Sequence, residues 1–250
     1  MNRTAAAIAL VAASLALSAC KEGQTSTTTA TTTTSAASGA ASGTAPANAN
    51  ALSSRVAATR DGVLIGDPNA RLKIVEYASP TCPACAAFST TGLEPLKREF
   101  IDNGKANLEI RPFIIHGPDP LIATILDCAG PERFLPLLEN VYASHNELMT
   151  QIQAGVPGAQ AAMSRPPAER MAAVTSAFGL DQFFAARGIP AERVRQCVSD
   201  QAKIERWVEA TNRNMTKDNV PGTPTFLLNG ELLQGVGDWA SLREALNAAS

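Results

Sequence analysis

Apolar and polar residues alternate in a pattern that predicts a strand, a helix and a second strand between residues 71 and 115. Residues 71–77 (Arg-Leu-Lys-Ile-Val-Glu-Tyr) are rich in β-forming side chains and predict the first strand. Apolar positions at helical spacing run over residues 83–101, and residues 107–115 predict the second strand. This order and spacing indicate a βαβ unit, in which the two strands are parallel neighbours.

Helical patterns dominate the second half of the chain. Between residues 118 and 200 Ala, Leu and Met prevail, and prolines stand where helices would start, so this block predicts four or five helices. After the block the sequence predicts a helix, two strands joined by an Asn-Gly turn, and a closing helix: 201–216, 225–228, 231–234 and 238–248. The predicted order is therefore β-α-β, a helical block, and then α-β-β-α.

The first 20 residues have the layout of a secretory signal. An apolar run over residues 5–17 follows a short basic start, and it is too short to span a bilayer as a helix. The run ends in Leu17-Ser18-Ala19-Cys20, which resembles the bacterial lipobox. That resemblance implies that Cys20 is lipidated and becomes the first mature residue; a plain cleaved signal is the alternative.

A segment of low complexity follows the signal. Residues 24–50 consist mostly of Thr, Ser, Ala and Gly, which offer too little apolar surface to offset the entropy of ordering. We therefore expect residues 21–54 to be a disordered tether between a membrane anchor and a folded part that starts near residue 55.

Composition narrows the candidate chemistry. The net charge of −2 over 250 residues gives no electrostatic case for binding nucleic acid. Only two histidines are present, His116 and His145, which limits any mechanism built on histidine. Five cysteines are present, and four remain once Cys20 is assigned to the signal: Cys82, Cys85, Cys128 and Cys197.

Three features together resemble the DsbA family of periplasmic thiol oxidoreductases. They are Cys82-Pro83-Ala84-Cys85 after the first strand, the helical block, and Gly222-Thr223-Pro224-Thr225-Phe226 before the hairpin. The resemblance covers nearly all of residues 60–250. It implies an α/β protein with a thioredoxin-like fold (residues 55–117 and 201–250) interrupted by an all-helical insertion (118–200).

The chemistry of the C-x-x-C pair follows from its place at a helix start. Unpaired backbone N–H groups and the positive end of the helix dipole favour a thiolate there and lower its pKa. We expect Cys82 to be the N-cap and the exposed, attacking sulfur, with Pro83 as the first helical residue. Cys85, one turn further on, would be the more buried, resolving sulfur. The pair would then work as a redox-active disulfide without a metal or organic cofactor.

Other uses of the pair are less well supported. A structural zinc site needs four ligands, and no second C-x-x-C or C-x-x-H follows; copper handling is the metal alternative that stays open. A structural disulfide without turnover is a second alternative. A cysteine hydrolase using Cys82 with His116 or His145 would leave Cys85 unexplained.

The family resemblance assigns roles to further residues. It implies a cis Thr223–Pro224 bond lying against the C-x-x-C pair, where the Thr223 backbone can bind an extended substrate chain; an ordinary trans proline is the alternative. It also implies that Glu76 is buried beneath the disulfide, where desolvation would raise its pKa and proton transfer to Cys85 could involve it. The alternative for Glu76 is an exposed strand glutamate.

The resemblance also implies a second, structural disulfide between Cys128 and Cys197, with two buried free thiols as the alternative. Closing a loop of this length stabilises a fold by roughly 4 kcal/mol in the chain-entropy description.

The expected function is that of an exported thiol:disulfide oxidoreductase, anchored in the cell envelope and acting as an oxidant. Ala84 stands where strongly oxidising DsbA enzymes have histidine, so we expect a milder oxidant whose Cys82 pKa still lies below that of a free thiol. Its partners would be unfolded or reduced exported proteins and a membrane electron-relay protein. An isomerase or reductase of the same fold, and a non-catalytic envelope binding module, are the alternative functions.

Overall fold

The computed structural model describes residues 51–250. The expected signal, the lipidation site Cys20 and nearly all of the expected tether lie outside the described residues. The last residues of that tether, Leu52–Ser54, form a short 3₁₀ helix, η1, whose Ser53 N–H donates to the Asp102 carboxylate at 2.9 Å. The ordered chain therefore starts before residue 55, the boundary expected from composition.

Six strands form a single mixed sheet within the described part of the chain, in the order β1-β2-β4-β3-β5-β6. The strands β3 and β4 are parallel, as the sequence predicts, and every other neighbouring pair is antiparallel. The strands span Val56–Ala58 (β1), Val63–Gly66 (β2), Leu72–Ala78 (β3), Ala106–Pro112 (β4), Thr225–Leu228 (β5) and Glu231–Leu232 (β6).

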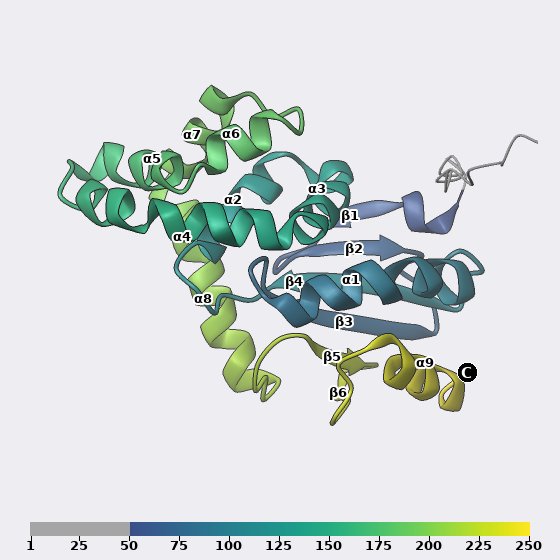
Figure 1. Cartoon of the computed structure of the whole chain (residues 1–250). Helices are drawn as coiled ribbons and strands as arrows, with labels where there is room; N and C mark the ends of the chain where they lie inside the picture. The colour runs from purple at the N-terminus through teal and green to yellow at the C-terminus, as the bar shows by residue number, and fades with distance from the viewer. Residues whose placement is uncertain (1–50) are drawn as a thin grey trace, which may run out of the picture. The chain divides into compact units, whose positions relative to one another are not determined.

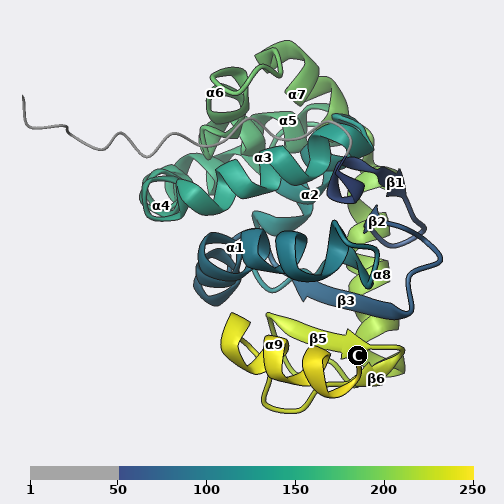
Figure 2. The same ribbon diagram turned by 90° about the vertical axis from the view of Figure 1, so that its right-hand side faces the viewer.

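The helices lie on both sides of this sheet (Figures 1 and 2). Helices α1 and α9 are on one side, α8 is on the other, and the insertion sits beyond one edge. The helices span Pro83–Leu96 (α1), Asp119–Cys128 (α2), Pro131–Ala143 (α3), His145–Ala162 (α4), Pro167–Ala177 (α5), Leu180–Ala185 (α6), Ala191–Ser199 (α7), Gln201–Lys217 (α8) and Trp239–Ala248 (α9). In residues 51–250 no helix combines the length and apolar character needed to cross a bilayer.

Several elements differ from the sequence prediction. The hairpin of β1 and β2 was not predicted, although Asp61-Gly62 between two short apolar runs is a turn signal. Residues 118–200 contain six helices rather than the predicted four or five. The short helix α6, of six residues, was too short to predict from the sequence pattern. The strand expected over residues 107–115 ends at Pro112, which has no N–H for a ladder bond.

The helix α1 continues into one π-helical turn, η2 (Lys97–Ile101). Pro95 lies inside α1 and cannot donate the usual helical hydrogen bond, and the chain then closes with a bond from the Asp102 N–H to the Lys97 carbonyl at 2.8 Å. Gly104, with φ of 73°, then ends the helical segment.

Two apolar clusters hold the fold together. The larger one joins the α1 side of the sheet to α9 and to the insertion helices. The smaller one lies on the other face of the sheet and consists of four buried residues: Tyr77, Phe113, Val220 and Leu227. This small cluster is the apolar floor beneath the loop that leads from α8 to β5.

A disulfide joins Cys128, the last residue of α2, to Cys197 in α7. The two Cα atoms are 6.0 Å apart across a sequence separation of 69 residues. The bond therefore ties the first helix of the insertion to its last one.

Candidate active site

The C-x-x-C pair lies where β3 passes into α1. Cys82 is the N-cap of α1 in an extended conformation, with φ −79° and ψ 122°, and Pro83 is the first helical residue. The Cys85 N–H points at the Cys82 sulfur at 3.4 Å, so the sulfur takes the place of a capping oxygen. This is the local geometry that the sequence predicts.

The burial of the two sulfurs differs from expectation in one respect. Cys82 is only 4% exposed, so the prediction of an exposed attacking sulfur is wrong. The reason is that the Thr223 carbonyl lies 3.3 Å from the Cys82 sulfur and covers it. Pro83 and Ala84 are nevertheless exposed, which places Cys82 directly beneath the surface. Cys85, with no exposed surface, is the more deeply buried of the pair, as expected.

The loop before β5 supplies the partner of the first sulfur. The Thr223–Pro224 bond is cis. The Cys82 thiol donates to the Thr223 carbonyl. The Thr223 hydroxyl is buried and bonds no other described group, so it can donate to Cys82 once that sulfur is a thiolate.

The electrostatic environment separates the two sulfurs. The pKa of Cys82 is lowered to about 5, chiefly because the Cys85 thiol donates a hydrogen bond to its sulfur. Burial opposes this shift, whereas the Thr223 hydroxyl and the N–H groups of Cys85 and Ala84 reinforce it. Burial raises the pKa of Cys85 far above its ordinary value. At neutral pH the pair is therefore one thiolate and one thiol.

Glu76 lies in β3 beneath the pair and is 4% exposed. Burial raises its pKa to about 8, and the negative charge of Cys82 adds to the rise. The carboxyl group therefore holds a proton at neutral pH. The expectation of a buried Glu76 with a raised pKa agrees with this geometry.

Both histidines meet at Thr81, the residue before Cys82. The His116 Nδ1 lies 2.8 Å from the Thr81 hydroxyl, and the His145 Nε2 lies 3.0 Å from the Thr81 carbonyl. Because a carbonyl only accepts, His145 must donate through Nε2. In residues 51–250 neither ring bonds the Cys82 sulfur, which is the contact that a cysteine hydrolase would require.

The most heavily bonded side chain near the site is one that the sequence did not single out. Asp119, in the first turn of α2, is fully buried. Its carboxylate accepts hydrogen bonds from five groups: the Thr81 N–H and hydroxyl, the Ser79 hydroxyl, and the N–H groups of Ile115 and His116. Asp119 thus fixes the turn between β3 and α1 that carries Cys82.

The insertion also contributes to this turn. The Tyr142 hydroxyl, at the end of α3, donates to the Ser79 carbonyl at 3.1 Å. His145 follows as the first residue of α4. Side chains of the insertion therefore hold the active-site turn in place. In the sequence, the residue types of Asp119 and Tyr142 were the only signal of this role. Within the part of the chain that the structure describes, no three His, Cys, Asp or Glu side chains are grouped as a metal site.

Comparisons with known proteins agree with this geometry. A family model described as thioredoxin matches residues 58–248. A crystal structure of a protein-disulfide isomerase from Novosphingobium aromaticivorans is 32% identical, with a TM-score of 0.68, and the match covers 74% of this chain and 95% of that one. The chain therefore belongs to the thioredoxin family, and its fold, with a helical insertion, is DsbA-like. The resemblance to thiol:disulfide oxidoreductases inferred from the sequence is confirmed.

More distant relatives extend the picture. A putative protein-disulfide oxidoreductase from Rickettsia felis is 26% identical over 168 residues, which are 67% of this chain and 53% of the relative. The chain thus spans about half the length of the curated Rickettsia relatives it matches. The Wolbachia pipientis α-DsbA1 structure is 18% identical with a TM-score of 0.59, covers 77% of this chain and 92% of that one, and shows the fold alone.

The Thr223 hydroxyl gives a direct test of the site's electrostatics. Replacing Thr223 with valine removes one hydrogen bond to the thiolate, so the pKa of Cys82 is expected to rise by about one unit. Thiolate absorbance measured against pH reports the change. Thr90→Val is the matched control, because the Thr90 hydroxyl donates within α1 to the Ala86 carbonyl. Equal pKa values in both variants would show that the hydroxyl does not act on the sulfur.

Proposed function

We propose that the protein is an exported thiol:disulfide oxidoreductase that works through the Cys82–Cys85 pair as an oxidant of envelope proteins. The observation that carries the proposal is the pairing of a low-pKa sulfur at a helix start with a buried, protonated neighbour. A structural cysteine pair has no need of this difference, whereas disulfide exchange depends on it.

The reaction follows from the two environments. In the oxidised protein a substrate thiolate attacks the Cys82 sulfur, and the bond to Cys85 breaks. Cys85 leaves with the electron pair and takes up a proton, for which the protonated carboxyl of Glu76 is the buried donor. A second substrate thiolate then attacks the substrate sulfur held on Cys82, and Cys82 leaves as a thiolate. The substrate loses two electrons to form its disulfide, and the protein gains them as a thiolate at Cys82 and a thiol at Cys85. The Glu76 carboxylate then takes up a proton from water.

The stability of the Cys82 thiolate sets the direction. A low pKa makes Cys82 a good leaving group and stabilises the reduced protein, which favours giving the disulfide away. A value of about 5 lies between the roughly 7 of thioredoxin and the roughly 3.5 of strongly oxidising DsbA. The absence of a histidine at Ala84 fits this intermediate position, and a milder oxidant is therefore the proposed behaviour.

One relative supports a second activity. The Novosphingobium protein, at 32% identity, is described as a protein-disulfide isomerase. Isomerisation uses the same Cys82 attack but starts from the dithiol form and regenerates it. The two activities differ in the redox form that turns over, so a scrambled disulfide substrate and a reduced substrate distinguish them.

The proposed location is the cell envelope. The signal-like residues 1–20, Cys20 as a lipid attachment site and the tether expected over residues 21–54, shortened by the ordered Leu52–Ser54, would hold the redox domain near a membrane. The proposed partners are unfolded or reduced exported proteins and a membrane protein that removes the two electrons. The thioredoxin-like part (55–117 and 201–250) and the insertion (118–200) remain the proposed division of the chain, with the bond between Cys128 and Cys197 as a structural clamp.

The test combines turnover with the potential of the pair. The oxidised protein is expected to convert a reduced substrate to its disulfide form, with a reduction potential between about −270 and −120 mV. Reduced protein with both active-site thiols alkylated is the control. A potential at or below that of thioredoxin would contradict the oxidant role. Turnover of scrambled substrate alone would favour isomerisation.

A further inference from the structure

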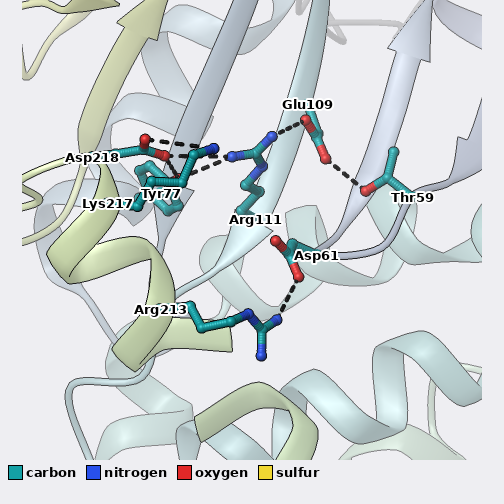
Figure 3. A network of polar contacts seen from close by, with 8 residues as sticks. All are labelled: Thr59, Asp61, Tyr77, Glu109, Arg111, Arg213, Lys217 and Asp218. Carbon is teal, nitrogen blue, oxygen red and sulfur yellow. Dashed lines mark hydrogen bonds and ion pairs between the residues drawn. The ribbon is translucent and has the colours of Figure 1, made fainter. Parts of the chain in front are cut away.

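The loop that carries Thr223 and Pro224 is held at both ends by one residue, Tyr77, whose contact with Asp218 is drawn in Figure 3. At the start of the loop the Asp218 carboxylate accepts a hydrogen bond from the Tyr77 hydroxyl. At its end Thr225 is the ladder partner of Tyr77 in the pairing of β3 with β5. We call residues 218–224 the substrate loop. The loop starts beside Tyr77 at the end of α8 and enters the sheet beside Tyr77 at Thr225.

A cluster of charged and polar side chains fixes the Tyr77 hydroxyl. Arg111 donates to this hydroxyl at 2.9 Å and to Glu109 at 2.6 Å. The Thr59 hydroxyl donates to the other oxygen of Glu109 at 2.6 Å, and the Arg111 guanidinium also lies 3.7 Å from Asp218. Figure 3 shows these side chains joined in one line across the sheet face.

Burial strengthens the polar contacts of this cluster. The side chains of Arg111 and Asp218 are 18% and 10% exposed, so their charges are partly shielded from water. Burial and the bond to Asp218 raise the pKa of Tyr77 above its ordinary value. The hydroxyl therefore stays protonated and acts as the hydrogen-bond donor to Asp218. The ammonium group of Lys217, 3.7 Å from Asp218, is the only other charge among the described residues that pairs with this carboxylate.

Apolar contacts hold the same segment. Two residues after the end of α8, Asn219 adopts a left-handed conformation with φ of 52°. The Val220 N–H then returns to the Met215 carbonyl at 3.2 Å, and the Val220 side chain is buried in the small cluster with Tyr77. The polar cluster and the apolar cluster therefore meet at Tyr77, and both fix the chain shortly before it reaches Thr223.

We propose that Tyr77 and Asp218 are positioning residues, which hold the substrate loop so that Thr223 stays against the Cys82 sulfur. The inference deepens the proposed function, because the same loop would receive the substrate chain. It extends the active site through the sheet, from the sulfur to Tyr77, Arg111 and Glu109 on the opposite face. None of these side chains touches a reacting atom.

The chain offers a matched control for this inference. Arg213 forms an ion pair with Asp61 at 2.9 Å, and it also ties α8 to the rest of the domain. This pair lies beside the cluster in Figure 3 but contacts no residue of the substrate loop. Its loss removes a comparable contact of the same helix without releasing Asp218.

The experiment measures the pKa of Cys82 and the KM for an extended reduced peptide in Tyr77→Phe and Arg213→Met. Tyr77→Phe removes only the hydroxyl, so the loop loosens and the Thr223 hydroxyl moves away from the thiolate. We expect the pKa of Cys82 to rise by up to about one unit and the KM to rise about threefold or more. Arg213→Met is expected to leave both values unchanged.

Further variants separate positioning from a general loss of structure. Asp218→Ala is expected to behave like Tyr77→Phe, and it serves as the second variant if Tyr77→Phe does not fold. Asp218→Asn, whose amide oxygen still accepts from Tyr77, is expected to restore the pKa. Adding Tyr77→Phe to Thr223→Val is expected to raise the pKa no further, because both act through one hydroxyl.

Three results would overturn the inference: an unchanged Cys82 pKa in folded Tyr77→Phe and Asp218→Ala, an equal shift in Arg213→Met, or additive shifts in the double variant. Absence of turnover in the unaltered protein would instead overturn the proposed function. The pKa measurement needs no turnover, so the two failures are distinguishable.

Discussion

Replacing Cys82 with serine is expected to abolish disulfide exchange, whereas replacing Cys85 with serine is expected to trap substrates as mixed disulfides. Cys82 has the lowered pKa and lies beneath the surface at the helix start, so we expect it to be the sulfur that bonds the substrate. Without it, turnover should fall by at least about three orders of magnitude, as when other covalent nucleophiles are removed. Without Cys85, nothing within the pair releases the bound substrate.

Non-reducing electrophoresis after incubation with a disulfide-containing substrate measures the trapped species. The double variant Cys128→Ser with Cys197→Ser is the control, because the disulfide that it removes joins insertion helices α2 and α7 and does not include an active-site cysteine. It should turn over substrate without trapping it. Adducts that persist in Cys82→Ser would mean that another thiol is the nucleophile.

Reduction of the Cys82–Cys85 disulfide is expected to make the stability of the protein depend more steeply on pH. In the folded reduced protein the pKa of Cys82 is about 5, whereas an unfolded cysteine has a pKa of about 8.5. A depressed folded pKa adds stability that is complete above the unfolded value and is lost as pH falls through about 5. The free energy of unfolding of the reduced form should therefore rise relative to the oxidised form between about pH 5 and pH 8.5, by a few kcal/mol.

Glu76 acts in the opposite sense, because its raised pKa of about 8 lowers stability as pH rises from about 4.5 to 8. Burial, the main cause of the raised Glu76 pKa, is present in both redox forms. The Glu76 contribution therefore largely cancels when the stabilities of the two forms are compared. Denaturant unfolding of both forms across this range measures the difference. Cys82→Ser, which has no thiolate at this position, is the control, and its free energy of unfolding should not rise with pH relative to that of the oxidised protein. If the difference between the reduced and oxidised unaltered protein does not change with pH, Cys82 is not a thiolate.

Local sequence signals predicted much of the fold and the position of the Cys82–Cys85 pair at the start of a helix. Proline after Cys82 marks the helix start, the Asn229-Gly230 turn marks the hairpin, and the β-forming run before the site marks the central strand. Each signal lies within a few residues of the feature it predicts. The cis bond at Pro224 and the link between Cys128 and Cys197 came from family resemblance, because no local pattern encodes either.

Features assembled from distant segments escaped the sequence. Asp119 reaches Thr81 across 38 residues, and Asp218 reaches Tyr77 across 141. In the sequence each is one surface-type acid among many, and only the fold shows which backbone groups or hydroxyls it meets. The burial of Cys82 was missed for the same reason, because the carbonyl that covers it belongs to Thr223, in a different part of the chain.

The shallow cover over Cys82 has a consequence for selectivity. Cys82 is only 4% exposed, so its sulfur cannot contact a cysteine on the flat surface of a folded globular protein. A flexible strand with its cysteine at a kink could reach down beside Pro83 and displace the overlying peptide group. We therefore expect the protein to favour clients caught before they are compact, and to ignore the same thiols once those clients have matured.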